Sequence, residues 1–280
     1  MSAHAITVRN HLIPTLWDGF AQSMPLLARP VLMQLFLTPV RRVPRRPNQG
    51  TVLGHVSARG RQVCVRASGQ GPTVALVHGW QGYAGQFDVL REELVSRGYR
   101  VVFFDMPAHG ETGGRTSSIV EFCYVLQRVA EIAGPLHAVV GHSLGATATS
   151  LALRRGMRVG GAALLSPLVS FDFALDEFAR VLKLGDRAKE LAARSTERKV
   201  GVARADLDLF GFDRPTQRLF LYHDRDDKRT RYEDSATLAR TWECALVESR
   251  GLGHTRFLRD AGIVTKICEF VESIPTGISK

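Results

Sequence analysis

From residue 50 onward, short apolar runs alternate with longer amphipathic segments. Runs at 51–56 and 62–66 flank a turn at 59–61 and predict two strands that form an antiparallel edge. Apolar strands that alternate with amphipathic helices predict an α/β fold with a mostly parallel central sheet flanked by helices. Further strands are predicted at 73–77, 100–105, 136–140, 160–165, 218–222 and 244–248, and helices at 84–97, 117–132, 146–155, 231–242 and 260–273.

Residues 168–216 break this alternation because they contain no convincing strand. Apolar residues recur at helical spacing over 171–182, and short helices are predicted at 188–193 and 203–210. The stretch is too long for a simple loop in a compact domain, so it predicts an inserted helical cap. Its aromatic residues suggest an apolar pocket roof. Among them are Phe171, Phe173, Phe178 and Phe210.

The N-terminal residues 1–49 form a separate basic and apolar arm in this interpretation. The longest apolar piece, 31–37, is far shorter than the roughly 20 residues that a membrane span needs. The favoured interpretation is a helix packed on the domain and followed by solvated arginines. The alternative is an interfacial helix, with weak membrane-surface contact through residues 12–46. The arginines that follow the apolar piece are Arg41, Arg42, Arg45 and Arg46.

Charge and size limit the classes of protein to consider. With 280 residues, of which 45% are hydrophobic, the chain can bury one large core, formed by residues 50–167 and 217–280. The net charge is +10, and residues 1–70 contribute +8 of it through nine arginines against Asp18, which leaves +2 for the rest. A basic arm on a nearly neutral body argues against a nucleic-acid partner.

Four cysteines without C-x-x-C pairing argue against a zinc site or a disulfide framework and favour a reducing, cytoplasmic location. The first ten residues carry only Arg9, and no clean apolar segment with a cleavage site follows, so no secretory signal is predicted. A protein at the membrane periphery is the alternative if the arm contacts lipid.

The main candidate for chemistry is Gly141-His142-Ser143-Leu144-Gly145, a G-x-S-x-G sequence between a predicted strand and a predicted helix. In that setting the serine lies on a strained turn that exposes its hydroxyl, and a Cβ at either glycine would collide with a neighbouring element. Ser143 is therefore the candidate nucleophile. An ordinary turn rich in glycine and serine is the alternative.

A serine nucleophile needs a base, and the base needs an acid that orients it. His254 lies in a glycine-rich loop between the last predicted strand and helix and is the candidate base. Three acids, Asp224, Asp226 and Asp227, follow the strand at 218–222. Because three carboxylates repel one another, we expect a solvent-exposed pair and one inward-facing member.

Taken together, these motifs resemble the α/β-hydrolase fold superfamily over about residues 50–274. In that family an H-G-x-x-D segment carries the acid four residues after its histidine, which implies Asp227 as the acid, with Asp226 as the alternative. Asp224 in place of the glycine, and Thr230-Arg231 in place of the usual Val-Pro, depart from the family pattern. The matching segments are His78-Gly79-Trp80, Asp105-Met106-Pro107-Ala108-His109-Gly110, the sequence around Ser143, His223 to Asp227, and Gly253-His254.

The resemblance implies further roles. It places the oxyanion hole at the backbone N–H groups of Leu144 and Trp80, with the Trp80 side chain at the mouth of an acyl pocket. His109 is assigned to a structural turn, and His142 is a less favoured base than His254 because its neighbours on the elbow aim it away from the serine hydroxyl. No metal-ligand cluster, phosphate-binding glycine loop or nucleotide fingerprint is visible in the sequence, so no cofactor is expected.

These features predict an esterase-like serine hydrolase that cleaves a carboxylic ester or thioester through an acyl-enzyme on Ser143, His254 and Asp227. Its partner would be a small-molecule ester, with a medium-length acyl or an aromatic group suggested by the cap. An acyltransferase or amidase with the same triad, and a non-catalytic ligand-binding protein on the same fold, are the alternatives. The physiological substrate and the oligomeric state do not follow from the sequence.

Overall fold

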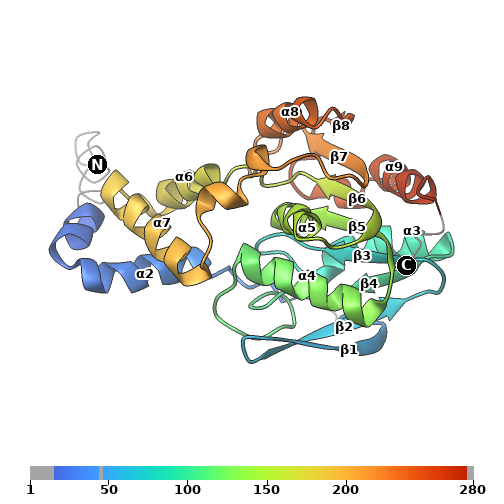
Figure 1. Ribbon diagram of the computed structural model, residues 1–280, viewed down its shortest axis with the longest axis horizontal. Coiled ribbons are helices and arrows are strands. Elements are labelled where there is room, and N and C mark those ends of the chain that lie inside the picture. Colours follow the sequence, from blue (N-terminus) through green and yellow to red (C-terminus); the bar gives the residue numbers. More distant parts are fainter. Residues whose placement is uncertain (1–15, 44–46, 276–280) are drawn as a thin grey trace, which may run out of the picture. The chain divides into compact units, whose positions relative to one another are not determined.

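The computed structural model describes residues 16–43 and 47–275 (Figure 1). Contacts divide the chain into two compact units. The helical unit comprises the described part of Met1–Thr38 together with Ser170–Gly211, and the sheet unit comprises Pro39–Val169 and Phe212–Lys280 up to residue 275. Part of the predicted membrane-contact region, residues 12–15, Arg45 and Arg46, lies outside the described residues.

An eight-stranded sheet, within the described residues, forms the centre of the sheet unit in the order β1-β2-β4-β3-β5-β6-β7-β8. β1 pairs with β2, and β2 with β4, in antiparallel fashion, and every other pair is parallel. The predicted mostly parallel sheet with an antiparallel opening pair is therefore confirmed. The strands are β1 (Thr51–Ala58), β2 (Arg61–Ser68), β3 (Thr73–Val77), β4 (Arg100–Phe103), β5 (Leu136–His142), β6 (Val159–Leu165), β7 (Arg218–Asp224) and β8 (Leu246–Ser249).

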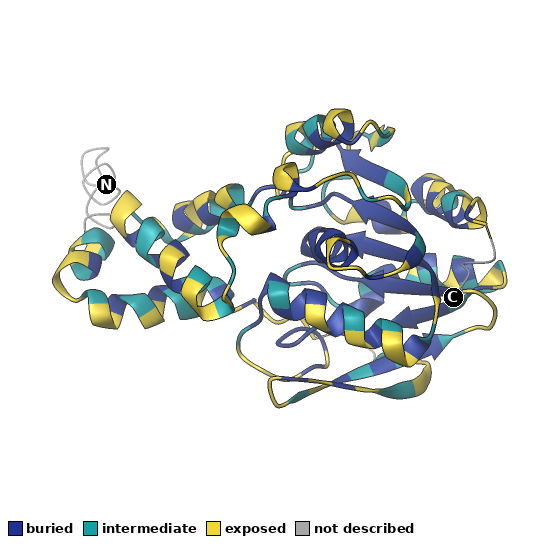
Figure 2. Cartoon of the chain, viewed as in Figure 1, coloured by how far each residue is buried: buried dark blue, intermediate teal, exposed yellow. Residues whose placement is uncertain are grey.

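Burial follows the position of each strand in the sheet. Every residue of β3 and β5 is buried, because helices cover both faces of these central parallel strands (Figure 2). Near the edge, β2 alternates between buried and less buried positions, as a strand with one covered face does. The uninterrupted apolar runs at 73–77 and 136–140 are thus explained by central placement.

Helices cover the two faces of the sheet. On one face, helices α3 and α9 pack on strand side chains such as Val74, Leu76 and Val140. Helices α4 and α5 contact each other on the opposite face, and α8 packs beside β7 and β8 (Figure 1). The predicted flanking helices are therefore present. Their bounds are η1 (Ala84–Phe87), α3 (Asp88–Ser96), α4 (Ile119–Ala133), α5 (Leu144–Arg154), α8 (Tyr232–Thr241), η4 (Arg256–Arg259) and α9 (Ala261–Glu272).

The helical unit joins the N-terminal segment to the insertion, two parts that the sequence predicts separately. Ala28 and Leu32 pack with Ala188 and Ala192 in a small core. The Asp18 carboxylate accepts the Ala188 N–H at 2.9 Å, in the first turn of α7. The association therefore depends on apolar contact and on a helix cap. Besides a helical stretch at 16–23, the unit contains α2 (Pro25–Leu37), α6 (Phe171–Leu182), α7 (Asp186–Val200), η2 (Arg204–Leu207) and η3 (Leu209–Gly211).

The insertion forms helices only, with α6 at the predicted bounds and α7 longer than the predicted 188–193. Phe178, one of the phenylalanines of the predicted pocket roof, packs edge-on against Phe36 at 5.0 Å between ring centres, inside the helical unit. Of the helices in the described residues, none is long and apolar enough to cross a membrane.

Candidate active site

Ser143 stands at the sharp junction between β5 and α5. Its φ of +54° and ψ of −123° are unusual for a residue with a side chain, so the turn is strained. A Cβ added at Gly141 would lie 2.7 Å from the Ala146 Cα, and one at Gly145 would lie 2.3 Å from the Val77 carbonyl oxygen. Only glycine fits at either position, which confirms the steric reason given for the G-x-S-x-G spacing.

The segment after β3 packs directly on this serine. A Cβ at Gly79 would lie 2.6 Å from the Ser143 Cβ and 3.2 Å from its Oγ. His78 holds the segment in place, because its Nε2 accepts the Met106 N–H at 2.9 Å and its Nδ1 donates to the Gly79 carbonyl at 2.8 Å. Burial lowers the pKa of His78 to about 4, against the opposing hydrogen bond to Gly79, so this histidine is neutral near pH 7.

Asp227 and His254 meet at the carboxyl ends of β7 and β8. The His254 Nδ1 donates to the Asp227 Oδ2 at 2.7 Å, and the Asp227 carboxylate is fully buried. Its Oδ1 accepts the N–H groups of Arg229 at 2.7 Å and Thr230 at 3.2 Å. Burial alone would raise the pKa of Asp227, but hydrogen bonds from His223 and His254 outweigh it and hold the pKa well below its usual range.

The three neighbouring aspartates have different partners. Asp226 is exposed and accepts the Gly251 N–H at 2.8 Å, with no contact to His254. Asp224 is fully buried, and its carboxylate accepts hydrogen bonds from the Ser249 hydroxyl and the Leu252 N–H. The expectation of an exposed pair was wrong, because Asp224 ends a buried strand and has enough donors around it to remain charged.

His142 links the elbow to the loop that carries His254. Its Nε2 donates to the His254 carbonyl at 2.8 Å, and the two imidazole rings are 4.6 Å apart. Burial lowers the pKa of His142 well below its ordinary value. Among the described contacts, no hydrogen bond joins the Ser143 hydroxyl to His254. The structure thus brings His254 to Asp227 and to the residue before Ser143, but not into hydrogen-bond contact with the serine.

The two residues of the predicted oxyanion hole follow the elbow and the His78-Gly79 segment. Leu144 is the first residue of α5, where backbone N–H groups have no intrahelical acceptor. Trp80 is half-buried, and its ring packs against His109 at 5.1 Å and Phe122 at 6.5 Å between centres. The Trp80 side chain therefore takes part in a cluster of aromatic rings with His109 and Phe122.

His223 and Thr230 also contact the Asp227 carboxylate. His223 is fully buried, with its Nε2 3.4 Å from the Asp227 Oδ2 and its Nδ1 2.7 Å from the Ser235 hydroxyl. In the sequence, His223 is recognised as the histidine of the H-G-x-x-D segment, and Thr230 as a departure from the usual Val-Pro. The sequence does not indicate that both side chains contact the same carboxylate.

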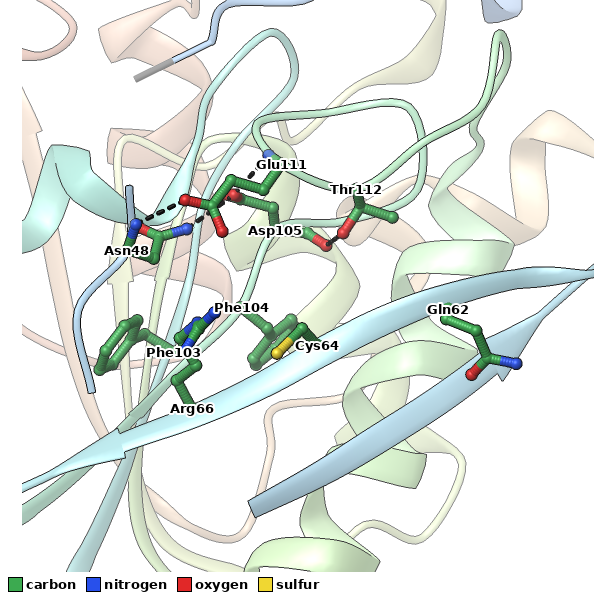
Figure 3. A pocket seen from close by; sticks show the side chains of 9 residues that line it. All are labelled: Asn48, Gln62, Cys64, Arg66, Phe103, Phe104, Asp105, Glu111 and Thr112. Atoms are coloured by element: carbon green, nitrogen blue, oxygen red, sulfur yellow. Dashed lines mark hydrogen bonds between the residues drawn. The ribbon is translucent and has the colours of Figure 1, made fainter. Parts of the chain in front are cut away.

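A small pocket of about 50 Å³ lies at the carboxyl end of β4 (Figure 3). Its centre is Asp105, whose carboxylate accepts the N–H groups of Ala84 and Glu111 and the amide of Asn48. Burial raises the pKa of Asp105 in spite of these hydrogen bonds. None of the predicted catalytic residues lines this pocket. Four of its polar residues hydrogen-bond among themselves, namely Asn48, Asp105, Glu111 and Thr112. It is lined by Asn48, Gln62, Cys64, Arg66, Phe103, Phe104, Asp105, Glu111 and Thr112.

All four cysteines are free thiols. In the described ranges, no group of three or more histidine, cysteine or acidic side chains is arranged to hold a metal ion.

Comparison with known proteins identifies the class. A model of the alpha/beta hydrolase family matches residues 74–265, which is more than half of the chain. The chain therefore belongs to the alpha/beta hydrolase family. This confirms both the resemblance and the fold predicted from the sequence.

A curated relative is the pimeloyl-[acyl-carrier protein] methyl ester esterase of Nitrosospira multiformis. It is 33% identical over 119 residues, a match that covers 38% of this chain and 43% of that protein. The matched part thus spans less than half of the relative's length.

Solved structures share the fold at low sequence identity. Est1E of Butyrivibrio proteoclasticus, solved with ferulic acid bound, has a TM-score of 0.59 and 18% identity over 78% of this chain and 96% of that one. The esterase EaEST of Exiguobacterium antarcticum has a TM-score of 0.60 and 16% identity over 80% of this chain and 100% of its own. A thioesterase domain from the curacin biosynthetic pathway has a TM-score of 0.58 and 19% identity over 78% and 98% of the two chains.

Proposed function

We propose that this protein is a serine hydrolase that cleaves a carboxylic ester or thioester of a small molecule. Family membership supports hydrolytic chemistry, and the curated relative is named as a methyl ester esterase. The observation that carries the proposal is the buried Asp227–His254 hydrogen bond of 2.7 Å beside the strained elbow of Ser143. Asp226 is a poor candidate for the acid because its carboxylate binds Gly251 instead.

In the proposed mechanism, the Ser143 Oγ attacks the carbonyl carbon while the His254 Nε2 accepts the hydroxyl proton. The tetrahedral intermediate collapses as the bond to the leaving group breaks, and the leaving group takes the proton from His254. Water then attacks the acyl-enzyme in the same way and releases the carboxylic acid. Asp227 remains ionised throughout, since its pKa lies well below the usual range, and it stabilises the imidazolium.

Two further features serve this mechanism. The N–H groups of Leu144 and Trp80 would donate to the oxyanion, each worth about 3 kcal/mol in the transition state. A turn of the Ser143 side chain toward His254 is needed before attack, and such contacts commonly tighten only when substrate is bound.

The test is covalent labelling by a fluorophosphonate, which reacts with activated serines. We expect wild type and Ser150→Ala to be labelled, because Ser150 is a buried serine of α5 that only donates within its helix. Ser143→Ala should not be labelled, and His254→Ala should react about 10²–10⁴-fold more slowly. Labelling of Ser143→Ala at the wild-type rate would identify another nucleophile, and an unlabelled, inactive wild type would favour the ligand-binding alternative.

The acyl acceptor and the substrate belong to the same proposal. An acyltransferase or amidase would share the triad, and we favour water as the acceptor because the curated relative is named as an esterase.

The insertion leaves the sheet at the carboxyl end of β6, the edge that also carries Ser143, and on this ground we propose that it acts as a cap. A series of p-nitrophenyl esters should then show a maximum at medium chain length, whereas a rate that falls steadily from acetate onward would oppose an apolar cap.

We also propose that the helical unit touches an anionic membrane surface. Met24, Leu27, Val31 and Leu35 recur at spacings of three and four along α2 and are all exposed, Leu27 to 60%. A helix that is apolar on its exposed side as well as its buried side needs a further apolar environment. Arginines follow this helix in the sequence, which suits anionic lipid.

Vesicle co-sedimentation tests this contact without removing the helix, whose Ala28 and Leu32 belong to the core of the unit. Leu27→Glu with Val31→Glu should abolish co-sedimentation with phosphatidylserine vesicles. Val181→Glu, at an exposed apolar position of α6, is the matched control and should still bind. Equal binding of both variants, or no binding by wild type, would end the proposal.

A further inference from the structure

The Asp227 carboxylate has a partner that the reaction described above does not use. The Thr230 hydroxyl lies 3.0 Å from the Asp227 Oδ2, 3.3 Å from the His223 Nε2 and 3.4 Å from the His254 Nδ1. Thr230 is 4% exposed, so water does not compete freely for these contacts. The hydroxyl therefore stands where the carboxylate and two imidazoles converge.

The direction of the hydrogen bonds follows from the number of protons. A hydroxyl has one proton to donate, and an ionised carboxylate can only accept. The His254 Nδ1 donates to Asp227, and the His223 Nε2 lies near two oxygens that can only accept, the Asp227 Oδ2 and the Thr230 carbonyl, so both ring nitrogens carry protons. The acceptors left for the Thr230 hydroxyl are the Asp227 Oδ2 at 3.0 Å and the Ser166 carbonyl at 3.4 Å. The carboxylate is both closer and charged, so the Thr230 proton is directed to Asp227.

Thr230 also binds the other oxygen of the same carboxylate. Its backbone N–H donates to the Asp227 Oδ1 at 3.2 Å, while its hydroxyl donates to Oδ2. Two donors from one residue, one on each oxygen, restrict rotation of the carboxylate about its bond to Cβ. The plane of the carboxylate is then set with Oδ2 toward the His254 Nδ1, 2.7 Å away.

We propose that Thr230 is a positioning residue that fixes the Asp227 carboxylate and, through it, the orientation of His254. The inference rests on the proposed function, because it assigns Thr230 a part in the same reaction. A valine at this position would keep the backbone N–H contact and the side-chain volume but lose the contact to Oδ2. Oriented catalytic groups lose rate steeply when the group behind them is free to turn.

The experiment compares Thr230→Val, Thr230→Ser and Thr112→Val with wild type. Thr112 is the matched control because it is 5% exposed and its hydroxyl donates to the Asp105 carbonyl at 2.7 Å, away from Asp227 and His254. We expect Thr230→Val to lower kcat about tenfold with KM unchanged, as the loss of one charge-assisted hydrogen bond does. Thr230→Ser should restore most of kcat, and Thr112→Val should keep the wild-type kcat although its melting temperature falls.

Thr230→Val with wild-type kcat would overturn the proposal, and so would a serine variant as slow as the valine variant. A loss of kcat in Thr112→Val equal to that in Thr230→Val would also overturn it, since any lost buried hydroxyl would then have the same effect. These outcomes leave the proposed function standing, because wild type is still labelled at Ser143. A wild type without labelling or ester hydrolysis overturns both.

Discussion

Two buried aspartates of the sheet unit follow strands of the same sheet but have different surroundings. Asp105, after β4, receives hydrogen bonds from two backbone N–H groups and an asparagine amide. Asp227, after β7, receives them from His254 and Thr230 as well as from two backbone N–H groups. The pKa of Asp105 is raised by burial, whereas that of Asp227 is lowered because its hydrogen bonds outweigh burial.

The difference shows that burial alone does not decide what an aspartate does. Neutral donors tie Asp105 to three segments of chain, and it has no histidine partner among its described hydrogen bonds, so it acts as a structural anchor. Asp227 keeps its charge and places it against an imidazole that can become protonated. The same side chain therefore supports a loop in one place and, in our proposal, catalysis in the other.

The largest expected effect comes from Asp227→Asn. An amide NH₂ in place of Oδ2 would donate to the His254 Nδ1 and leave the proton on Nε2, the tautomer that cannot accept the serine proton. We expect kcat to fall about 10⁴-fold, the loss seen when a triad base is held in the wrong tautomer. Ester hydrolysis measured on folded, monodisperse protein checks this. A loss below tenfold would remove Asp227 from the triad.

Asp105→Asn should have the opposite profile. Both oxygens of Asp105 accept hydrogen bonds from N–H groups, so the amide NH₂ of an asparagine would point at one of these donors. That donor would lose its acceptor, and each buried group left unpaired lowers the unfolding free energy by about 1–3 kcal/mol. We therefore expect a clear loss of unfolding free energy in urea, with hydrolysis per folded molecule as in wild type. A variant of full stability and reduced kcat would show that Asp105 takes part in the chemistry.

The dependence of stability on pH should separate the two carboxylates by sign. The folded pKa of Asp227 lies below 3.8, the ordinary value for an aspartate, so its stabilisation is present above that pH and is lost as the pH falls through the folded pKa. The folded pKa of Asp105 lies above 3.8, so its contribution is present below that pH and is lost as the pH rises through the folded pKa.

Urea unfolding of wild type and of both asparagine variants, across about pH 3 to pH 7, measures these contributions by difference. On acidification from pH 7, the stability advantage of wild type over Asp105→Asn should grow as the pH falls through the raised folded pKa toward 3.8. Its advantage over Asp227→Asn should shrink only below about pH 4. Equal slopes for the two differences would contradict the assignment of opposite pKa shifts.

The smallest effect is expected for His142→Phe. Phenylalanine keeps a ring beside Phe257 but removes the donor to the His254 carbonyl, which helps to place the base. The loss of one such hydrogen bond should lower kcat about 3–10-fold. A loss as large as that of His254→Ala would instead identify His142 as the base.

The sequence predicts the sheet and the elbow well for a local reason. Runs such as 73–77 and 136–140 are apolar without interruption because their strands are covered on both faces, and both become fully buried strands. The glycines at 141 and 145 are required by contacts within a few residues and with the neighbouring strand. Signals of this kind are present in the order of residues itself.

The contacts that these elements make with distant segments cannot be read from the nearby sequence. Helix α7 extends well beyond its predicted length because its polar residues carry little periodic signal, and its first turn is capped by Asp18, 170 residues earlier in the chain. The inward turn of Asp224 likewise depends on donors from the end of β8 and from the loop that follows it. Such contacts join distant segments and leave no spacing pattern to read.

The sequence by itself determined the layered fold, the strained serine and the candidate base, because each depends on periodicity, steric limits or a motif. For the acid it favoured Asp227 through the family motif and left Asp226 open. Only the tertiary structure decided which hydrogen bonds surround each buried carboxylate, and so which aspartate stays charged. It also placed His223, Thr230 and His254 around one carboxylate. Those contacts exist only once β7, β8 and the loops after them lie side by side.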